Sequence, residues 1–386
     1  MHLGKAMKKQ SVALSLVGML IMISIQQLVA AGVPSAPGKI ARQVPAVYVL
    51  GDSTLDVGNN NYLPGKDVPR ANKPYYGIDF PVISKPTGRF SNGYNVADFI
   101  AKNLGFDKSP PAYLMLKAHN RLIPTALTMG VSYASAGAGI LDSTNAGGNI
   151  PLSKQVRDFK STRGEMVSKV GSGAVRRLLA KSFFLFGVGS NDMFVFSAAQ
   201  QKQNRTATPA DRKLFYSNLI SNYSAAITEL YKMGARKFAI INLGPVGCVP
   251  IVRLASATGA CDDRMNQLAV GFDGELKSLM AGLAARLPGL AYSLADSFAS
   301  TQLTFANPAA AGFANADSAC CGSGRLGSEG ECRRGASLCG DRDRYVFWDR
   351  VHPSQQACKL GAQAYFYGPA HLISPINFSQ LAAYSS

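Results

Sequence analysis

The chain has 386 residues, of which 47% are hydrophobic and 16% are charged. This composition supports a sizeable buried core and excludes a disordered or coiled-coil protein, because both of those classes carry far more charge. The net charge is +17, but the sequence has no run of five or six Lys or Arg residues and no nucleic-acid-binding motif. We therefore expect no nucleic-acid partner, and the spread of basic residues favours a protein that works near polyanions.

Residues 1–31 are typical of a secretory signal peptide. Three lysines precede an apolar stretch over 12–25, which is short for a membrane span, and the small residues Val29-Ala30-Ala31 supply a cleavage site. The alternative is an N-terminal membrane anchor. No later run of 18 apolar residues occurs, so we expect an exported protein without stable membrane insertion.

Residues 32–45 form a lead-in, and a single domain is predicted over 46–386. Short apolar runs predict buried parallel strands at 46–50, 130–134, 183–188, 238–242 and 292–294. Apolar residues at helical spacing predict helices over 93–104, 153–170, 172–180, 211–233 and 263–286. The segments 56–92 and 300–342 are expected to be loops. Strands that alternate with helices predict an α/β fold, a three-layer α/β/α sandwich with a central, mainly parallel sheet.

Export predicts that most of the seven cysteines are paired. Six of them fall in two clusters, over 248–261 and 320–339, which predicts a Cys248–Cys261 disulfide and leaves the connectivity within 320–339 open. Cys358 stands alone in a predicted helix over 353–366 and is expected to be unpaired. No Cys-x2-Cys spacing occurs, so a zinc site is not expected.

Three Asn-x-Ser/Thr sequons are candidates for N-glycosylation. Asn204 lies in a polar loop and is the best candidate, and Asn377 is a second. Asn222 falls at the edge of the apolar stripe of a long predicted helix, so we expect poor access for a glycan there.

The ends of the predicted strands are the place to search for chemistry, because parallel sheets place functional groups at their carboxyl ends. The first strand leads into Asp52-Ser53. A serine nucleophile needs a base, and that base needs a carboxylate to orient it. Of the four histidines, His352 alone has an acidic residue within five positions, Asp349.

Asp349 and His352 are three residues apart on a predicted tight loop, so their side chains can face the same way. Pro353 is expected in the first turn of the following helix. The alternative is that Asp349 only caps this helix and that His352 is exposed. For Ser53 the alternative is an ordinary turn residue.

Three groups are candidates for an oxyanion hole, which stabilises the negative oxygen of a tetrahedral intermediate. They are the backbone N–H of Ser53, the backbone N–H of Gly137 and the side-chain amide of Asn191, which follows the third strand. The alternatives are a packing glycine at 137 and a simple turn at 191. The sequence has no dinucleotide fingerprint, no P-loop and no metal-ligand cluster, so no cofactor and no metal are expected.

Several blocks of the sequence, taken in order, resemble the plant GDSL esterase/lipase family within the SGNH hydrolase superfamily. The resemblance extends over residues 45–370. The matching blocks are Gly51-Asp52-Ser53-Thr54-Leu55-Asp56, 86–93, 130–139, 189–192 and Trp348-Asp349 with His352-Pro353, and 243–248 and 319–322 are further landmarks.

The resemblance implies a secreted serine esterase or lipase that hydrolyses carboxylic esters, with Ser53, His352 and Asp349 as its triad. It also implies an oxyanion hole of Ser53, Gly137 and Asn191, although Gly139 aligns as well as Gly137. Thr54 stands where the family has Leu, and Ser132 where it often has Asn.

Two alternatives remain at this point. One is an acyltransferase with the same triad, and the other is a wall glycoprotein that has lost activity. The expected partners are a small ester or acyl lipid and, non-specifically, acidic wall polymers of the apoplast.

Overall fold

The computed structural model describes residues 41–81 and 85–385. The predicted signal peptide over 1–31 lies outside the described residues. The central sheet has the strand order β10-β5-β4-β3-β1-β2, and all neighbours are parallel except β10, which runs antiparallel to β5. The strands are β1 (Val47–Gly51), β2 (Gly130–Ser132), β3 (Phe183–Gly187), β4 (Lys237–Ile241), β5 (Ala291–Ala295) and β10 (Ile373–Ser374).

The five predicted strands are confirmed, each to within two residues at either end. The edge strand β10 was not predicted, because two residues show no periodicity. The strands are buried on both faces, as expected of a parallel sheet with helices on each side.

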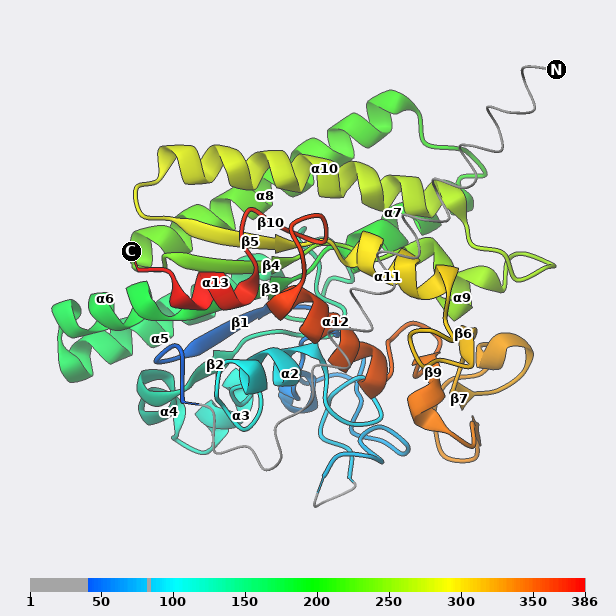
Figure 1. Ribbon diagram of the computed structural model, residues 1–386, viewed down its shortest axis with the longest axis horizontal. Helices are drawn as coiled ribbons and strands as arrows, with labels where there is room; N and C mark the ends of the chain where they lie inside the picture. The colour runs from blue at the N-terminus through cyan, green and yellow to red at the C-terminus, as the bar shows by residue number, and fades with distance from the viewer. Residues whose placement is uncertain (1–40, 82–84, 386) are drawn as a thin grey trace. The chain divides into compact units, whose positions relative to one another are not determined.

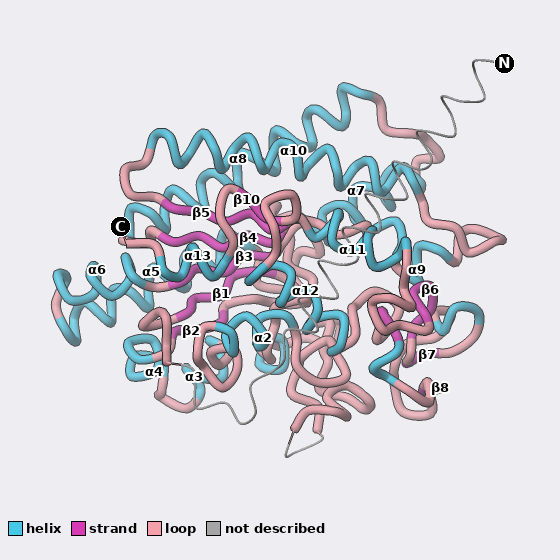
Figure 2. The backbone as a smooth tube through the Cα atoms, in the orientation of Figure 1, coloured by secondary structure: helices cyan, strands magenta, loops and turns pink. Residues whose placement is uncertain are grey.

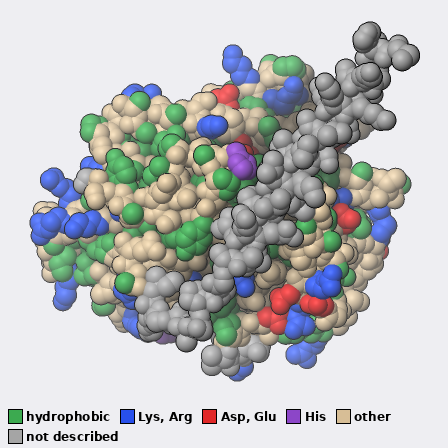
Figure 3. Space-filling model, in the orientation of Figure 1, with side chains coloured by type: hydrophobic (Ala, Val, Ile, Leu, Met, Phe, Trp, Pro, Cys, Tyr) green, Lys and Arg blue, Asp and Glu red, His purple; other side chains and the backbone are tan. Residues whose placement is uncertain are grey.

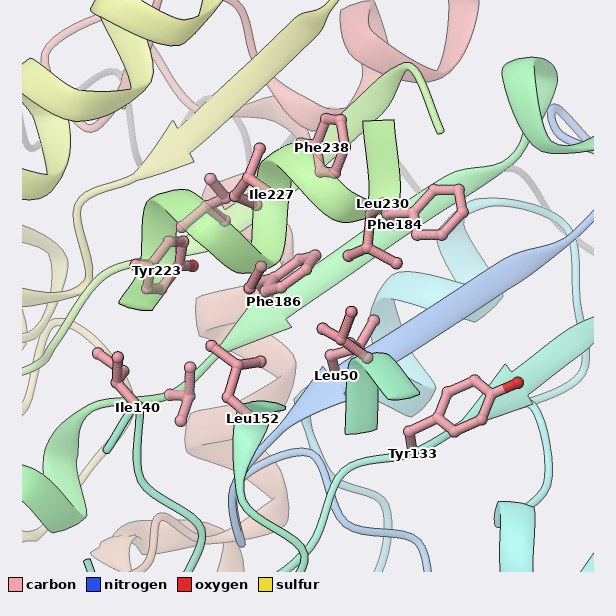
Figure 4. Close-up of a cluster of buried hydrophobic side chains, with 14 of the residues drawn as sticks. Leu50, Tyr133, Ile140, Leu152, Phe184, Phe186, Tyr223, Ile227, Leu230 and Phe238 are labelled. Carbon is pink, nitrogen blue, oxygen red and sulfur yellow. The ribbon is translucent and has the colours of Figure 1, made fainter. Parts of the chain in front are cut away.

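Alternate residues of each strand contribute to two separate cores. Tyr48 of β1 and Phe184 of β3 pack in the core that contains residues of α5, α8 and α10, whereas Val49 and Leu185 pack with residues of α2, α12 and α13. Figure 1 shows the sheet between these helices, and Figure 4 shows Phe184, Phe186 and Phe238 of the strands against α8. The predicted three-layer α/β/α sandwich is confirmed. The helices are α2 (Val96–Asn103), α5 (Leu152–Val170), α6 (Ser172–Lys181), α8 (Pro209–Met233), α10 (Asp263–Arg286), α12 (Gln355–Tyr367) and α13 (Phe378–Ala383).

The expectation of a stapled surface loop over 300–342 was right about the disulfides within it but wrong about its secondary structure. This stretch contains the end of α11 (Ser297–Ala306), the strand β6 (Asn315–Ala319), which pairs with β9 (Tyr345–Phe347), and the two-residue strands β7 (Cys321–Gly322) and β8 (Ser337–Leu338). Figure 2 shows β6, β7 and β8 apart from the central sheet. Strands this short in a Gly-rich stretch give no alternating pattern to detect. Other short helices are α3 (Tyr113–Ala118), α4 (Leu122–Thr128), α7 (Ser190–Lys202) and α9 (Pro250–Arg253).

Three disulfides hold the chain outside the central sheet. Cys248 pairs with Cys261 as predicted, and the open connectivity is resolved as Cys320–Cys339 and Cys321–Cys332. Cys358 is a free thiol, buried on α12, and burial raises its pKa to about 12. A thiol with such a pKa is almost wholly protonated at neutral pH and is a poor nucleophile.

Alkylation without reduction is therefore expected to label no cysteine in the folded protein and only Cys358 after unfolding. The pairing removes the other six from reaction, and burial protects the seventh until the core opens. Mass spectrometry of peptides from native and denatured samples measures this directly. Labelling of Cys248 or Cys261 in denatured, unreduced protein would contradict their pairing.

No helix within residues 41–81 and 85–385 is both long enough and apolar enough to cross a membrane.

Candidate active site

The candidate site lies where the order of the sheet reverses. β1 has β2 on one side and β3 on the other, so the chain leaves β1 in one direction and later crosses back over it. Ligands of open α/β sheets bind at this switch point, beyond the carboxyl ends of the strands. Ser53 is the second residue after β1 and lies at this position.

The turn that carries Ser53 is held against β3 by close backbone contact. A Cβ on Gly51 would lie 2.5 Å from the carbonyl oxygen of Gly187, so only glycine allows this approach. The buried side chain of Gln155, on α5, accepts from the N–H of Gly51 and donates to its carbonyl, both at 2.8 Å. These contacts fix the start of the turn and therefore the direction of Ser53.

Ser53, His352 and Asp349 meet in the structure. The Oγ of Ser53 lies 2.8 Å from Nε2 of His352, and Nδ1 of His352 lies 2.8 Å from Oδ2 of Asp349. The other oxygen, Oδ1, accepts from the backbone N–H groups of Val351 and His352, both at 2.8 Å. The side chains of His352 and Asp349 are 13% and 3% exposed, so this chain of hydrogen bonds is largely removed from water.

Asp349 does not cap the following helix. Ser354 is the N-cap of α12, and its side chain accepts from the N–H of Ala357. The expectation that Pro353 opens the helix was wrong: Pro353 precedes the cap and bridges to Phe347, while the N–H of Trp348 donates to the carbonyl of His352. This short turn precedes α12 in the chain, and it brings the side chains of Asp349 and His352 together.

The carboxylates near the site differ in their protonation. Burial alone would raise the pKa of Asp349, but the neighbouring His352, with hydrogen bonds from His352 and Tyr76, lowers it below its usual value. Burial raises the pKa of Asp52, which precedes the serine, to about 6, although Thr54 donates to it through both its backbone N–H and its hydroxyl. Asp349 therefore stays ionised at neutral pH, whereas Asp52 titrates in mildly acidic solution.

The oxyanion candidates lie around the same position. Among the described residues, the backbone N–H groups of Ser53 and Gly137 have no hydrogen-bond acceptor. Gly137 lines the pocket and has a φ of +83°. Gly139 is not among the lining residues, and a Cβ there would lie 2.4 Å from Thr144 and 2.6 Å from Asp192. Of the two glycines, Gly137 is therefore the one that lines the same pocket as Ser53.

Asn191 lies in the first turn of α7 and not in a simple turn after the strand. Its Nδ2 donates to the carbonyl of Ala138 at 2.9 Å, which uses one of the two amide hydrogens. The neighbouring Asp192 is buried and accepts from the N–H groups of Ile140 and Leu141. This carboxylate thereby holds the loop after Gly137 against the start of α7.

Ser53 and His352 line a pocket of about 930 Å³. One part of its lining is apolar and includes Phe194, Val249 and Ile251, while Asp67 and Arg350 add charges. A cleft of this size accommodates a small organic substrate. Within the described parts of the chain, no group of three or more His, Cys, Asp or Glu residues is placed to hold a metal ion.

Sequence reasoning missed two aromatic residues at the site. The ring of Phe90 packs on that of His352 with 4.8 Å between centroids, and the hydroxyl of Tyr76 donates to Oδ2 of Asp349 at 2.7 Å. Both residues come from the stretch 56–92, which was expected to be a loop. The one available signal was that Phe90 belongs to the resembling block 86–93; Tyr76 precedes that block and had no such signal.

Comparison with known proteins identifies a family. The model of the GDSL-like lipase/acylhydrolase family matches residues 47–364. GDSL esterase/lipase At5g55050 of Arabidopsis thaliana is 38% identical over 362 residues, covering 91% of this chain and 93% of the relative. GDSL esterase/lipase At1g71691 of the same plant is 35% identical over 343 residues, covering 88% and 86%.

Among solved structures, a lipase from a goat rumen metagenome is 13% identical, with a TM-score of 0.37, covering 82% of this chain and 94% of that one. This similarity is too low to bear on the fold or the function. The family model and the plant relatives each match most of the chain. The chain therefore belongs to the GDSL lipase/acylhydrolase family and is a carboxylic ester hydrolase.

Proposed function

We propose that the chain hydrolyses esters with Ser53 as nucleophile, His352 as general base and Asp349 as the carboxylate that orients the base. The observation that carries the proposal is the unbroken series of hydrogen bonds from Oγ of Ser53 through the imidazole to Asp349, each 2.8 Å long, beside a pocket that Ser53 and His352 line. A serine activated in this way attacks carbonyl carbons.

In the first step, Oγ of Ser53 bonds to the carbonyl carbon of the ester, and its proton passes to Nε2 of His352. The carbonyl oxygen becomes an oxyanion and accepts hydrogen bonds from the N–H groups of Ser53 and Gly137 and from the amide of Asn191. The intermediate then collapses, and the leaving alcohol takes the proton from Nε2. Water, activated in the same way, releases the acid from Ser53 and restores the hydroxyl.

The purified mature protein assayed on esters of graded acyl length and different alcohols tests this activity. The same assay with a second alcohol present measures how the acyl group partitions between water and that acceptor. Release of free acid as the main product supports hydrolysis, whereas ester exchange as the main product supports an acyltransferase. Absence of both products across the panel would support a silent glycoprotein.

The activity is expected to fall as the pH is lowered from neutral into the acidic range, since a general base must be neutral to accept a proton. Asp349 is not expected to cause this fall, because its pKa is lowered and it stays ionised there. A plot of kcat/KM against pH measures the effect. A profile that is flat from about pH 4 to 8 would contradict a general-base role for His352.

Asp52 is the group that confounds this measurement, since its pKa is raised to about 6. The variant Asp52→Asn removes that titration. If His352 is the base, the acid limb persists in Asp52→Asn, and if it vanishes there, Asp52 is responsible.

We also propose that the protein is exported to the apoplast or cell wall and carries a glycan on Asn204. Support comes from the apolar leader in the sequence, the three disulfides and the exposure of Asn204 in the turn after α7. Asn377 caps α13 with its side chain, which competes with modification. Asn222 is exposed on α8 rather than shielded, which corrects the expectation of poor access, but it lies within a continuous helix.

Acidic wall polymers are proposed as non-specific partners of the mature protein. Figure 3 shows Lys and Arg side chains gathered at the edge of the molecule where α6 lies. Exposed basic residues of α5 and α6 there are Lys169, Arg176, Arg177 and Lys181. Such a contact depends on ionic strength, because salt screens exposed charges.

A further inference from the structure

Among the described residues, Tyr76 is the one residue outside the triad whose side chain forms a hydrogen bond with a triad side chain. Its hydroxyl donates to Oδ2 of Asp349 at 2.7 Å, and the residue is 6% exposed. Its ring packs edge-on against Phe90 and Trp348, with centroids 5.8 and 6.4 Å away. Phe90 in turn packs on His352. Tyr76 therefore adjoins the dyad of Asp349 and His352 both through its hydroxyl and through its ring.

We propose that Tyr76 is a positioning residue for the reaction: its hydroxyl holds Oδ2 of Asp349 toward His352 and takes up part of the carboxylate's charge. This inference rests on the proposed function, since it assigns Tyr76 a role only if Asp349 orients the base. Tyr76 itself lies behind Asp349 and is not among the residues that line the pocket.

The pattern of acceptors on Asp349 supports this role. Oδ1 already receives two backbone N–H groups, from Val351 and His352. Nδ1 of His352 lies 2.8 Å from Oδ2 and 2.9 Å from Oδ1, and Tyr76 supplies the other donor to Oδ2. Without the hydroxyl, Oδ2 keeps only the imidazole contact that it shares with Oδ1, and the plane of the carboxylate is less tightly defined.

The segment that carries Tyr76 is anchored independently of the triad. The N–H of Gly77 donates to the carbonyl of Ser91 at 3.0 Å. Asp79 forms an ion pair with Arg342, with contacts of 2.6 and 2.7 Å, and accepts from Asn92 at 2.8 Å. The backbone around Tyr76 is thus held by contacts that do not involve its hydroxyl, so loss of the hydroxyl should leave the segment in place.

The protonation states of the two groups fit this hydrogen bond, with the Tyr76 phenol as donor and the Asp349 carboxylate as acceptor. Burial, followed by the charge of Asp349, raises the pKa of Tyr76 well above its usual value, so the phenol remains a neutral donor. The pKa of Asp349 is lowered despite its burial, in part by the Tyr76 hydrogen bond. A neutral donor on a carboxylate spreads its negative charge, which weakens its attraction for a protonated imidazole.

Removing the hydroxyl is therefore expected to strengthen the pairing of Asp349 with the protonated form of His352. The other charged groups around this dyad are Arg350 on the same loop, Asp52 after β1 and, farther away, Glu331 near Tyr76 and Asp192 near Asp52. All four are unchanged by a substitution at position 76. A shift of the acid limb in such a variant can thus be assigned to the lost hydroxyl.

The variant Tyr76→Phe tests the proposal, because it removes one oxygen and keeps the ring that packs on Phe90 and Trp348. We expect kcat to fall about ten-fold with little change in KM, as for a lost hydrogen bond to a charged group. We also expect the acid limb of kcat/KM to move to higher pH by about half a unit. A hydroxyl that served stability alone would lower the melting temperature and leave the limb where it is.

Tyr48→Phe is the matched control. Tyr48 is fully buried and its hydroxyl also makes one hydrogen bond, to the carbonyl of Ala126 at 2.8 Å, in the core that contains residues of α5, α8 and α10. Its loss should lower the melting temperature while leaving the pH profile unchanged.

Fluorotyrosine placed at position 76 gives a second test that does not depend on the folding of Tyr76→Phe. Ring fluorination makes the phenol a stronger donor of nearly the same shape, so the acid limb should move to lower pH. A wild-type pH profile in the fluorinated protein, or in a folded Tyr76→Phe variant, overturns the inference. Ser53→Ala, assayed alongside, distinguishes failure of this inference from failure of the proposed function. If Ser53→Ala is inactive, the proposed function stands even when Tyr76 has no role. If Ser53→Ala is active, both the proposed function and the role of Tyr76 are wrong.

Discussion

Replacing Ser53 with alanine is expected to remove nearly all ester hydrolysis and to leave the fold intact. Loss of a triad nucleophile costs about a million-fold in kcat in well-studied serine hydrolases. Ser53 Oγ lies 2.8 Å from Nε2 of His352, and the turn around it is held by Gly51 and Gln155 through contacts that do not use the serine side chain. Turnover of a good substrate, with the melting temperature of the same sample, measures both parts of the expectation.

Ser190→Ala is the matched control for this result. Ser190 is the other serine in the lining of the pocket, at the start of α7. Because it has no histidine partner among the described residues, its loss should lower turnover far less than the loss of Ser53 does. If Ser53→Ala keeps a tenth of wild-type turnover, or if Ser190→Ala is the inactive variant, the nucleophile has been assigned wrongly.

The sheet and the three triad candidates were predictable because their signals are local. An apolar run that ends at Gly51 identifies a buried strand, and parallel strands place their following residues at one edge of the sheet. Asp349 and His352 are three residues apart, so a single turn brings them together. The topology of the sheet then places Asp349 and His352 beside Ser53, although Ser53 and His352 are 299 positions apart in the sequence.

Contacts that depend on long-range packing could not be predicted in this way. Tyr76 meets Asp349 across 273 positions, and nothing in a Gly- and Pro-rich stretch indicates which of its tyrosines faces inward. The start of α7 at Ser190 was missed because Gly189-Ser190-Asn191-Asp192 has the composition of a turn. Pro353 was placed in the helix on its preference for first turns, but the bridge to Phe347 and the Ser354 cap shift the start of α12 to Gln355.

The position of Asn191 changes how its role must be tested. In the first turn of α7 its amide donates to the carbonyl of Ala138, so the residue has a structural contact as well as a proposed one to the oxyanion. A neutral hydrogen bond contributes about 1 kcal/mol to stability. For a chain of this size that corresponds to a fall of about 1 to 2 °C in the melting temperature.

Asn191→Ala is expected to lower kcat about a hundred- to a thousand-fold with little change in KM, since a donor to the oxyanion acts mainly in the transition state. The melting temperature of the same variant separates this role from a structural one, because the lost bond to Ala138 should lower it only slightly. Normal kcat in Asn191→Ala with a large drop in melting temperature would remove Asn191 from the oxyanion hole.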